Sequence, residues 1–169
     1  MAPMNNDLTE LIYEAYGIIG SLTPLKGADC GKLCDKICCR GDAAGMLLFP
    51  GEEAIFEGIA GFEIEEIEYM EAAGIKLLMC DGDCERALRP LACRIFPVAP
   101  LADENGGFGA VGDIRGRRMC PIWDLKYVDR AFVKAARRVF GLLSGHAEMA
   151  AFMRLVSAEQ EELMRFYKK

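Results

Sequence analysis

The stretch CGKLCDKICC, Cys30 to Cys39, places four thiols within ten residues, and its last two cysteines are adjacent. Four more cysteines follow later in the chain, whereas histidine occurs once, at His146. A cysteine can fill a core, form half of a disulfide, act as a nucleophile or bind a metal as a thiolate. The rest of the chain has to decide among these uses. The full set of cysteines is Cys30, Cys34, Cys38, Cys39, Cys80, Cys84, Cys93 and Cys120.

Length and composition predict one folded domain. The chain has 169 residues, of which 52% are hydrophobic and 27% charged, a balance typical of globular proteins. We expect a single domain over 1–169, with an N-terminal helix in 1–29, a cysteine-rich core in 30–123 and a helical region in 124–169. The expected fold class is α+β, mostly helical, with small irregular β elements around the cysteines.

The sequence favours a reducing compartment. No basic segment precedes an apolar run at the start, and no window approaches the roughly 18 apolar residues of a spanning helix. We therefore expect a cytoplasmic protein, in which disulfides are rare and clustered cysteines more often bind metal or do redox chemistry. The net charge of −6 argues against a nucleic acid or an anionic membrane as the main partner. Protein partners stay open.

Hydrophobic periodicity predicts the main elements. Apolar residues recur at helical spacing over 8–19 and again between 128 and 167, where Ser157 and Gln160 resemble a capping start. A helix is expected to open near Pro50, and 74–79 reads as a strand that delivers Cys80 and Cys84 on a turn. The run 62–74 fits strand and helix alike. Glycines at 106–107 predict a hairpin turn.

The thiols themselves predict a metal. Because the only histidine lies more than twenty residues past Cys120, any metal in the cysteine region is held by sulfur. Eight thiolates divide into two four-sulfur centres, which zinc and iron both accept, the latter also as an iron–sulfur cluster. The predicted ligands are the eight cysteines named above. No catalytic residue can be assigned, and whether the protein is an enzyme stays open.

The spacing restricts how the ligands are shared. If 30–39 were helical, Cys30 and Cys38 would lie about 12 Å apart along the axis, too far for one ion. The sulfurs of one zinc site lie within about 4 Å of each other. We therefore expect the adjacent Cys38 and Cys39 to serve different centres, which would join the two sites.

The order of these motifs resembles the CxxCxxCC family, whose members are described as zinc- or iron-chelating domains and, in some cases, as iron–sulfur oxidoreductases. The resemblance covers roughly 30–123 and includes the segments RPLACRIFP and MCPIW, although three residues rather than two separate the first cysteines here. It implies metal binding by all eight cysteines. The signature positions are Arg89, Pro90, Cys93, Arg94, Phe96 and Pro97.

Several other interpretations remain beside this one. An iron–sulfur oxidoreductase is one, and a modifying enzyme related to flagellin lysine methylases, which use S-adenosylmethionine, is another. The run Gly107 to Gly112 spells GxGxxG, but a proline soon follows it and no helix start does, so a hairpin is favoured over a dinucleotide site. Arg115, Arg117 and Arg118 could offset thiolate charge. Arg89 and Arg94 could donate to thiolates or backbone carbonyls, or pair with an acid.

Overall fold

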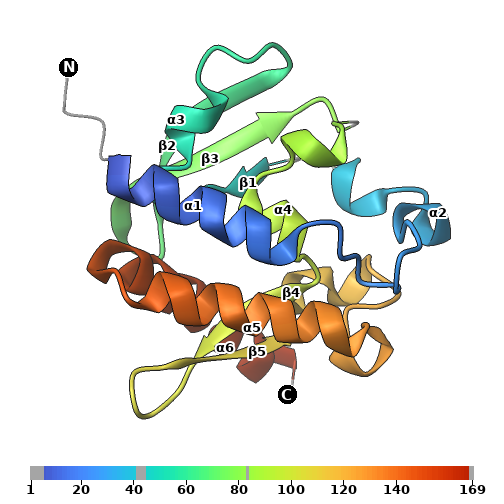
Figure 1. The fold of residues 1–169 in the computed structure, drawn as a ribbon. Helices are drawn as coiled ribbons and strands as arrows, with labels where there is room; N and C mark the ends of the chain where they lie inside the picture. The colour runs from blue at the N-terminus through green and yellow to red at the C-terminus, as the bar shows by residue number, and fades with distance from the viewer. Residues whose placement is uncertain (1–5, 41–44, 83, 168–169) are drawn as a thin grey trace.

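The computed structural model of this chain describes residues 6–40, 45–82 and 84–167 (Figure 1). It contains helices and strands, and its C-terminal region is helical, which confirms the predicted α+β class. The elements are α1 (Asn6–Ile19), α2 (Gly31–Cys34), η1 (Ile37–Cys39), β1 (Gly45–Leu47), α3 (Glu53–Phe56), β2 (Phe62–Tyr69), β3 (Ala72–Cys80), η2 (Arg86–Leu88), α4 (Leu91–Ile95), β4 (Val98–Ala102), β5 (Phe108–Gly112), η3 (Ile114–Arg118), η4 (Leu125–Tyr127), α5 (Arg130–Ser144) and α6 (Ala147–Tyr167).

The strands form two separate antiparallel sheets. The first has the order β1-β3-β2, so the long strand β3 is central, with Leu78 opposite Met46 on one side and Ile64 on the other. The second is the β4–β5 hairpin, in which Val98 pairs with Gly112. Figure 1 shows α1 and α5 crossing the molecule between these two sheets. The end of β3 carries Cys80 away from this packing and toward the α2 region.

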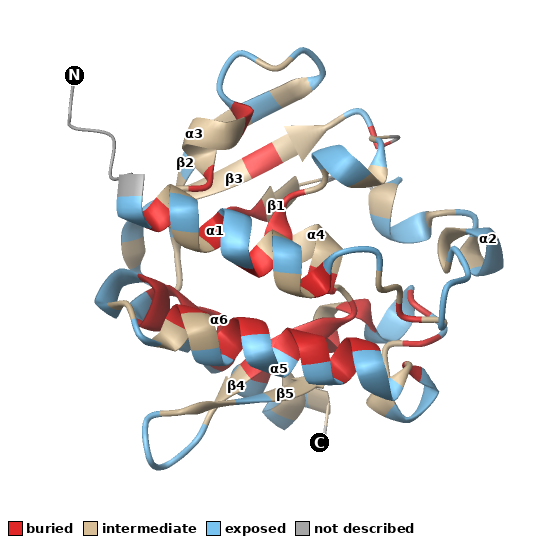
Figure 2. Ribbon diagram, in the orientation of Figure 1, coloured by how far each residue is buried: buried red, intermediate tan, exposed pale blue. Residues whose placement is uncertain are grey.

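The apolar core lies among the long helices (Figure 2). One face of α1 and one face of α5 are buried against each other, and α6 packs against β4. The fully buried side chains include Ile12 and Ile19 from α1, Phe132 and Phe140 from α5, and Met153 from α6. Among the described residues, no cysteine belongs to this cluster. The core that fixes the helices is therefore distinct from the cysteine region.

Several elements agree with the pattern in the sequence. The predicted helix over 8–19 is α1, the strand ending at Cys80 is β3, and the expected hairpin is β4–β5. The ambiguous run 62–74 is a strand, since β2 pairs along nearly its whole length with β3. None of the described helices combines the length and the apolarity that crossing a bilayer requires.

The cysteine stretch is not one helix. The helix α2 ends at Cys34, because Asp35 (φ 52°) and Lys36 (φ 55°) adopt left-handed backbone conformations, and a 3₁₀ turn then carries Cys38 and Cys39. The axial separation expected for a continuous helix over 30–39 therefore does not apply. The break folds the two halves of the stretch back on each other.

The predicted helix start at Ser157 is wrong, because α6 continues through it. The Ser157 hydroxyl accepts a hydrogen bond from the Ala102 backbone N–H at the end of β4 (2.8 Å). Gln160 accepts from the Ile114 N–H (2.8 Å) and donates to Asp113 (3.1 Å). These polar residues join α6 to the hairpin instead of capping a helix.

The GxGxxG run ends within a tightly packed strand. Gly109 and Gly112 lie on β5, and no described helix follows in the place that a dinucleotide fingerprint requires. A Cβ at Gly112 would lie 2.0 Å from the backbone oxygen of Trp123, whereas one at Gly109 would meet only Leu101 O, at 3.7 Å. Gly112 is needed for close backbone packing, and the hairpin interpretation is confirmed.

The two glycines of β5 give a matched test of this packing. We expect Gly112→Ala to lower the free energy of unfolding by about 2 kcal/mol or more, since the backbone at Trp123 has to move. Gly109→Ala keeps ordinary contact distances and should change stability by less than about 0.5 kcal/mol. Urea denaturation of both variants measures the difference; equal effects would contradict the close approach.

Candidate metal centre

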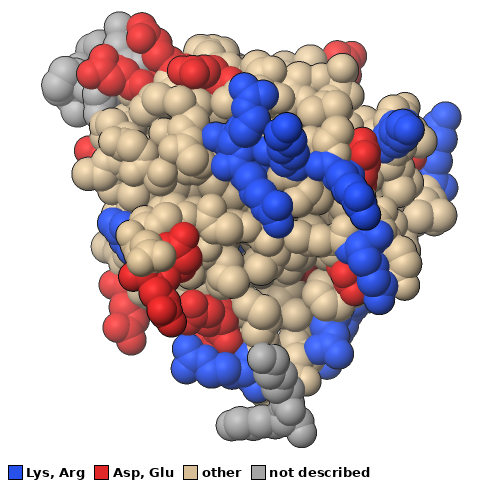
Figure 3. All heavy atoms as spheres, turned by 60° about the horizontal axis from the view of Figure 1, so that its bottom comes forward, with Lys and Arg blue, Asp and Glu red and all other residues tan. Residues whose placement is uncertain are grey.

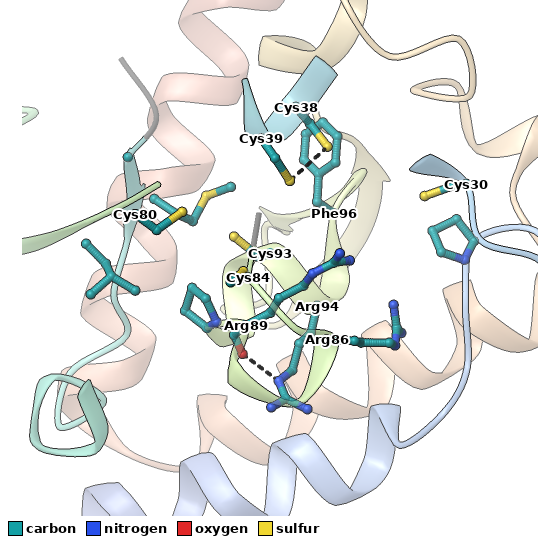
Figure 4. A pocket seen from close by; sticks show the side chains of 15 residues that line it. Cys30, Cys38, Cys39, Cys80, Cys84, Arg86, Arg89, Cys93, Arg94 and Phe96 are labelled. Carbon is teal, nitrogen blue, oxygen red and sulfur yellow. Dashed lines mark hydrogen bonds between the residues drawn. The ribbon is translucent and has the colours of Figure 1, made fainter. Parts of the chain in front are cut away.

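Six of the eight cysteines line one cavity of about 70 Å³. They come from three parts of the chain: the stretch around α2 and η1, the end of β3 with the turn that follows it, and α4 (Figure 4). Three arginines line the same cavity. The cysteines are Cys30, Cys38, Cys39, Cys80, Cys84 and Cys93, and the arginines are Arg86, Arg89 and Arg94.

The turn after β3 lies directly against the cysteine stretch. Gly82 is buried, has φ +80°, and a Cβ added to it would lie 2.3 Å from the backbone oxygen of Cys39. Only glycine fits both the backbone conformation and this approach. The turn therefore brings Cys80 and Cys84 beside Cys39, while Asp83 lies outside the described residues.

The helix α4 places Cys93 from the other side. Its buried residues Leu91 and Ile95 belong to the apolar core, so the helix is anchored while Cys93 faces the cavity. The first turn is held by Glu52, a fully buried residue whose carboxylate accepts from the Leu91 N–H at 2.5 Å. Tyr16 donates its hydroxyl to the same oxygen at 2.6 Å, and the Phe49 N–H donates to the other at 3.0 Å.

Electrostatic neighbours divide the thiols into two sets. Burial raises the pKa of Cys93, and the charges of Cys39, Cys84 and Cys80 raise it further. Burial and then Cys80 raise the pKa of Cys84, which Arg89 lowers. These four cysteines form the first set: Cys39, Cys80, Cys84 and Cys93.

The second set contains Cys30, Cys34, Cys38 and Cys120. Burial, Asp29 and Cys34 raise the pKa of Cys30, and burial is also the main cause of the raised pKa of Cys120, with Cys30 and Cys34 adding to it. A hydrogen bond with Cys39 and burial raise the pKa of Cys38, to which Cys34 and Cys30 contribute. The Cys38 and Cys39 sulfurs lie 3.9 Å apart, so this adjacent pair links the two sets.

The structure does not place all eight predicted ligands together. Cys34 and Cys120 are not among the residues that line the cavity. Within the described parts of the chain, no three Cys, His, Asp or Glu side chains converge closely enough to hold a metal ion. The thiols are thus gathered as neighbours, and a metal would have to draw their sulfurs inward by side-chain rotation. Their donor chemistry suits zinc or iron, since no carboxylate lines this cavity.

The arginines of the cavity bind backbone atoms and face thiols. Arg94 donates to the carbonyls of Arg89 (2.6 Å) and Ala87 (2.7 Å), and its guanidinium stacks 3.9 Å from the Tyr16 ring centroid. Arg86 donates to the Leu22 carbonyl. The Nε of Arg89 is buried without a hydrogen-bond acceptor, and the neighbours that raise the pKa of Arg89 are Cys39, Cys84 and Cys93. Among the described residues, none of the three arginines forms an ion pair with an acid.

The predicted role of the later arginines is not what the contacts show. Arg115 pairs with buried Asp113 at 2.5 Å and lies 3.5 Å from Glu159, so its charge is already balanced. Arg117 stacks over the ring of Tyr167 at 4.6 Å, and Arg118 lies 5.5 Å from the same ring. The charges near the thiols come instead from Arg86, Arg89 and Arg94. Of these, Arg86 was not singled out from the sequence.

Comparison with protein families, with curated proteins and with solved structures finds no match for this chain. The resemblance to the CxxCxxCC family stays an expectation from the motif. The argument for function therefore rests on the cavity, the thiols and the charges around them.

Glu52 gives a pH-dependent test of the support behind Cys93. Burial raises the pKa of Glu52 from its usual 4.5 to about 7, against the hydrogen bonds from Tyr16, Leu91 and Phe49 that lower it. Folding thus favours the neutral acid, whose contribution is fully present below pH 4.5 and is lost as the pH rises through 7. We expect the stability of the unchanged protein relative to Glu52→Gln to fall by about 3 kcal/mol over this range.

Urea denaturation of both proteins between pH 4.5 and pH 8 measures this difference, in which the titration of all other groups cancels. The variant Glu57→Gln, on an exposed position of the same segment, controls for the loss of one carboxylate. A difference between Glu52→Gln and the unchanged protein that stays constant with pH would contradict the raised pKa.

Proposed function

We propose that this chain is a metal-binding protein that holds two zinc or iron ions through thiolates, one in each of the two cysteine sets. The first site uses Cys39, Cys80, Cys84 and Cys93. The second uses Cys30, Cys34, Cys38 and Cys120. The observation that carries the proposal is the gathering of six thiols from three chain segments around one small cavity with three arginines that lack acidic partners.

The size and lining of the cavity favour a metal over an organic ligand. Pockets for organic cofactors or substrates have volumes of roughly 300–1,000 Å³, whereas this cavity has about 70 Å³. Its polar groups are thiols and guanidinium groups rather than the mixed hydrogen-bonding groups of a substrate site. Sulfur-only donor sets prefer zinc, iron and iron–sulfur clusters. A methyl donor such as S-adenosylmethionine has less support at this place.

The charge balance also supports a thiolate centre. Two ions of charge +2 held by eight thiolates carry a formal charge of about −4. Three arginines beside neutral thiols would repel one another: Arg89 and Arg94 lower the pKa of Arg86 after burial does. Deprotonated, metal-bound sulfurs would supply the acceptors that these guanidinium groups lack, including one for the buried Nε of Arg89.

The packing of the cysteine stretch gives a third argument. The helix α2 and the turn η1 bury no residue, and their two large apolar side chains are exposed: Leu33 by 59% and Ile37 by 44%. Two left-handed residues in between are costly for non-glycine side chains. Apolar burial therefore does not hold this segment, and coordination through Cys30, Cys34, Cys38 and Cys39 would do so.

When bound, closed four-thiolate zinc centres would staple the three segments together, and an iron–sulfur centre would in addition accept and release an electron. The chain's own residues supply the sulfurs, keep carboxylates away from them and place guanidinium groups around them. A reducing cytoplasm, as expected from the sequence, would keep the thiols available for metal.

Metal counting on paired variants tests the grouping of ligands. We expect about two equivalents of metal in protein purified without oxygen. Cys84→Ser with Cys93→Ser removes two ligands of one site and should cost one equivalent. Cys34→Ser with Cys93→Ser removes one ligand from each site and should cost close to two. Elemental analysis gives the stoichiometry and the metal, and a visible absorbance band that bleaches with reductant would identify iron–sulfur chemistry instead of zinc.

Less than one equivalent in the unchanged protein would sink the proposal. Equal losses in the two double variants would reject the grouping while leaving metal binding intact. Far-ultraviolet circular dichroism controls for folding, because the long helices belong to a core without cysteines among its described members.

Metal removal should loosen the structure locally. With an excess of chelator, we expect the amides of Lys36 and Cys39, which donate to Gly31 O and Lys36 O, to exchange hydrogen on the order of 100-fold faster. The amides of Val139 and Phe140, whose side chains are fully buried in α5, should stay protected. Hydrogen exchange followed by mass spectrometry measures both. Unchanged exchange over 31–39 would show that metal does not hold this stretch.

A further inference from the structure

Charge is strongly segregated along this chain. Residues 115–138 contain eight Lys or Arg against two Asp, whereas 52–71 contain eight Glu and no basic residue. Figure 3 shows Lys and Arg side chains gathered on one face of the molecule. In a protein of net charge −6, such a concentration of positive charge is a local feature that the overall balance hides.

The centre of this basic region is a hollow at the start of α5. Four of its lining side chains are cationic: Lys126, Arg130, Lys134 and Arg137. The volume of the hollow is about 450 Å³, much larger than the thiol cavity. Along α5 the basic positions 130, 134, 137 and 138 follow helical spacing and fall on one stripe about 12 Å long. All four are exposed.

These cations are not neutralised by the protein itself. In the described part of the chain, Arg130, Lys134, Arg137 and Arg138 make no ion pair. Lys126 pairs with Asp124 at 3.1 Å. The positive end of the α5 dipole adds to the field at Arg130. The stripe therefore attracts an anionic group that this chain does not supply.

The hollow is not only charged. Its remaining lining residues are Leu125, Val128 and Val133, so its floor is apolar. Beside it, Tyr127 is 57% exposed, with the Lys126 ammonium 4.8 Å from its ring. Tyrosine and arginine are the residue types that dominate protein–protein hot spots. An apolar floor ringed by cations suits a ligand that has both an apolar side chain and carboxylates.

We propose that the hollow at the start of α5 is a docking site for a short acidic segment of a partner protein, with one apolar side chain of that segment seated on Leu125, Val128 and Val133. Its carboxylates pair with Arg130, Lys134 and Arg137. A nucleic acid or an anionic membrane is the less suitable occupant, because an extended polyanion would also meet the acidic surface of this chain. The proposal does not rest on the metal centre.

Synthetic peptides test the proposal on the full-length protein. The probe is a peptide of about 12 residues in which glutamates flank a central leucine, and its matched control replaces the leucine by glycine. Titration calorimetry measures both against the unchanged protein, Arg130→Glu with Arg137→Glu, and Arg154→Glu with Arg165→Glu. The last pair changes the net charge equally, on the exposed side of α6.

We expect the leucine peptide to bind, with an affinity that falls as salt rises and that the Arg130/Arg137 reversal weakens at least tenfold. The Arg154/Arg165 reversal should change it less than about threefold. The glycine peptide should bind several-fold more weakly, because it leaves the apolar floor uncovered.

No binding up to about 1 mM, or equal binding by the Arg130/Arg137 variant, overturns the proposal. So does tighter binding of a single-stranded thymidine oligonucleotide of equal charge or of vesicles containing phosphatidylserine, since either would identify a different class of occupant. Equal affinity of the leucine and glycine peptides would reject the apolar anchor and with it the proposed mode of docking.

Discussion

A buried carboxylate holds together the elements on which the thiol cavity depends. Glu52 accepts hydrogen bonds from the Tyr16 side chain on α1, from the backbone at Phe49 and from the first turn of α4 at Leu91. Because each donor belongs to a different element, one side chain sets the position of α4 relative to the helical core. Cys93 lies one helical step further along α4. An unpaired charge in such a place would be costly, and the three donors offset that cost.

Around the cavity the charges are arranged so that each group lacks what its neighbour supplies. Burial raises the pKa of Cys30, Cys84 and Cys93 and so favours their neutral forms, while Arg89 opposes this at Cys30 and Cys84. The guanidinium groups, in turn, receive backbone carbonyls but no carboxylates. Such a site is indifferent to hard cations, which prefer oxygen, and is suited to ions that displace protons from sulfur. Selectivity follows from what is excluded as much as from what is present.

The sequence predicted those features that local pattern determines. The periodicity of α1, the strand leading to Cys80 and the glycine turn of the β4–β5 hairpin depend on neighbouring residues and are confirmed. Failures came where distant partners decide. Ser157 looks like a helix cap but bonds to Ala102, and Arg115 looks available to thiolates but pairs with Asp113. No local signal distinguishes such partners.

The candidate site shows the same division. Cysteine spacing alone selected the ligand type, yet the break at Asp35 and Lys36 and the role of Glu52 were invisible, since polar residues in a turn-rich stretch carry no unique pattern. Glu52 follows Pro50 and Gly51 and was interpreted only as an acid near a helix start. Its burial depends on Tyr16 and Leu91, which are 36 and 39 residues away.

The cost of ordering the cysteine stretch explains why a metal is the fitting partner for this fold. Fixing the backbone of ten residues costs about 10–20 kcal/mol in conformational entropy, and 31–34 with 37–39 bury no side chain to offset it. Thiolate coordination of zinc contributes about 10–16 kcal/mol in small domains, which is the same size. The helical core needs no such contribution, since its apolar residues are buried independently of the thiols. The molecule thus combines two sources of order, apolar burial for α1, α5 and α6 and, on our proposal, coordination for the cysteine stretch.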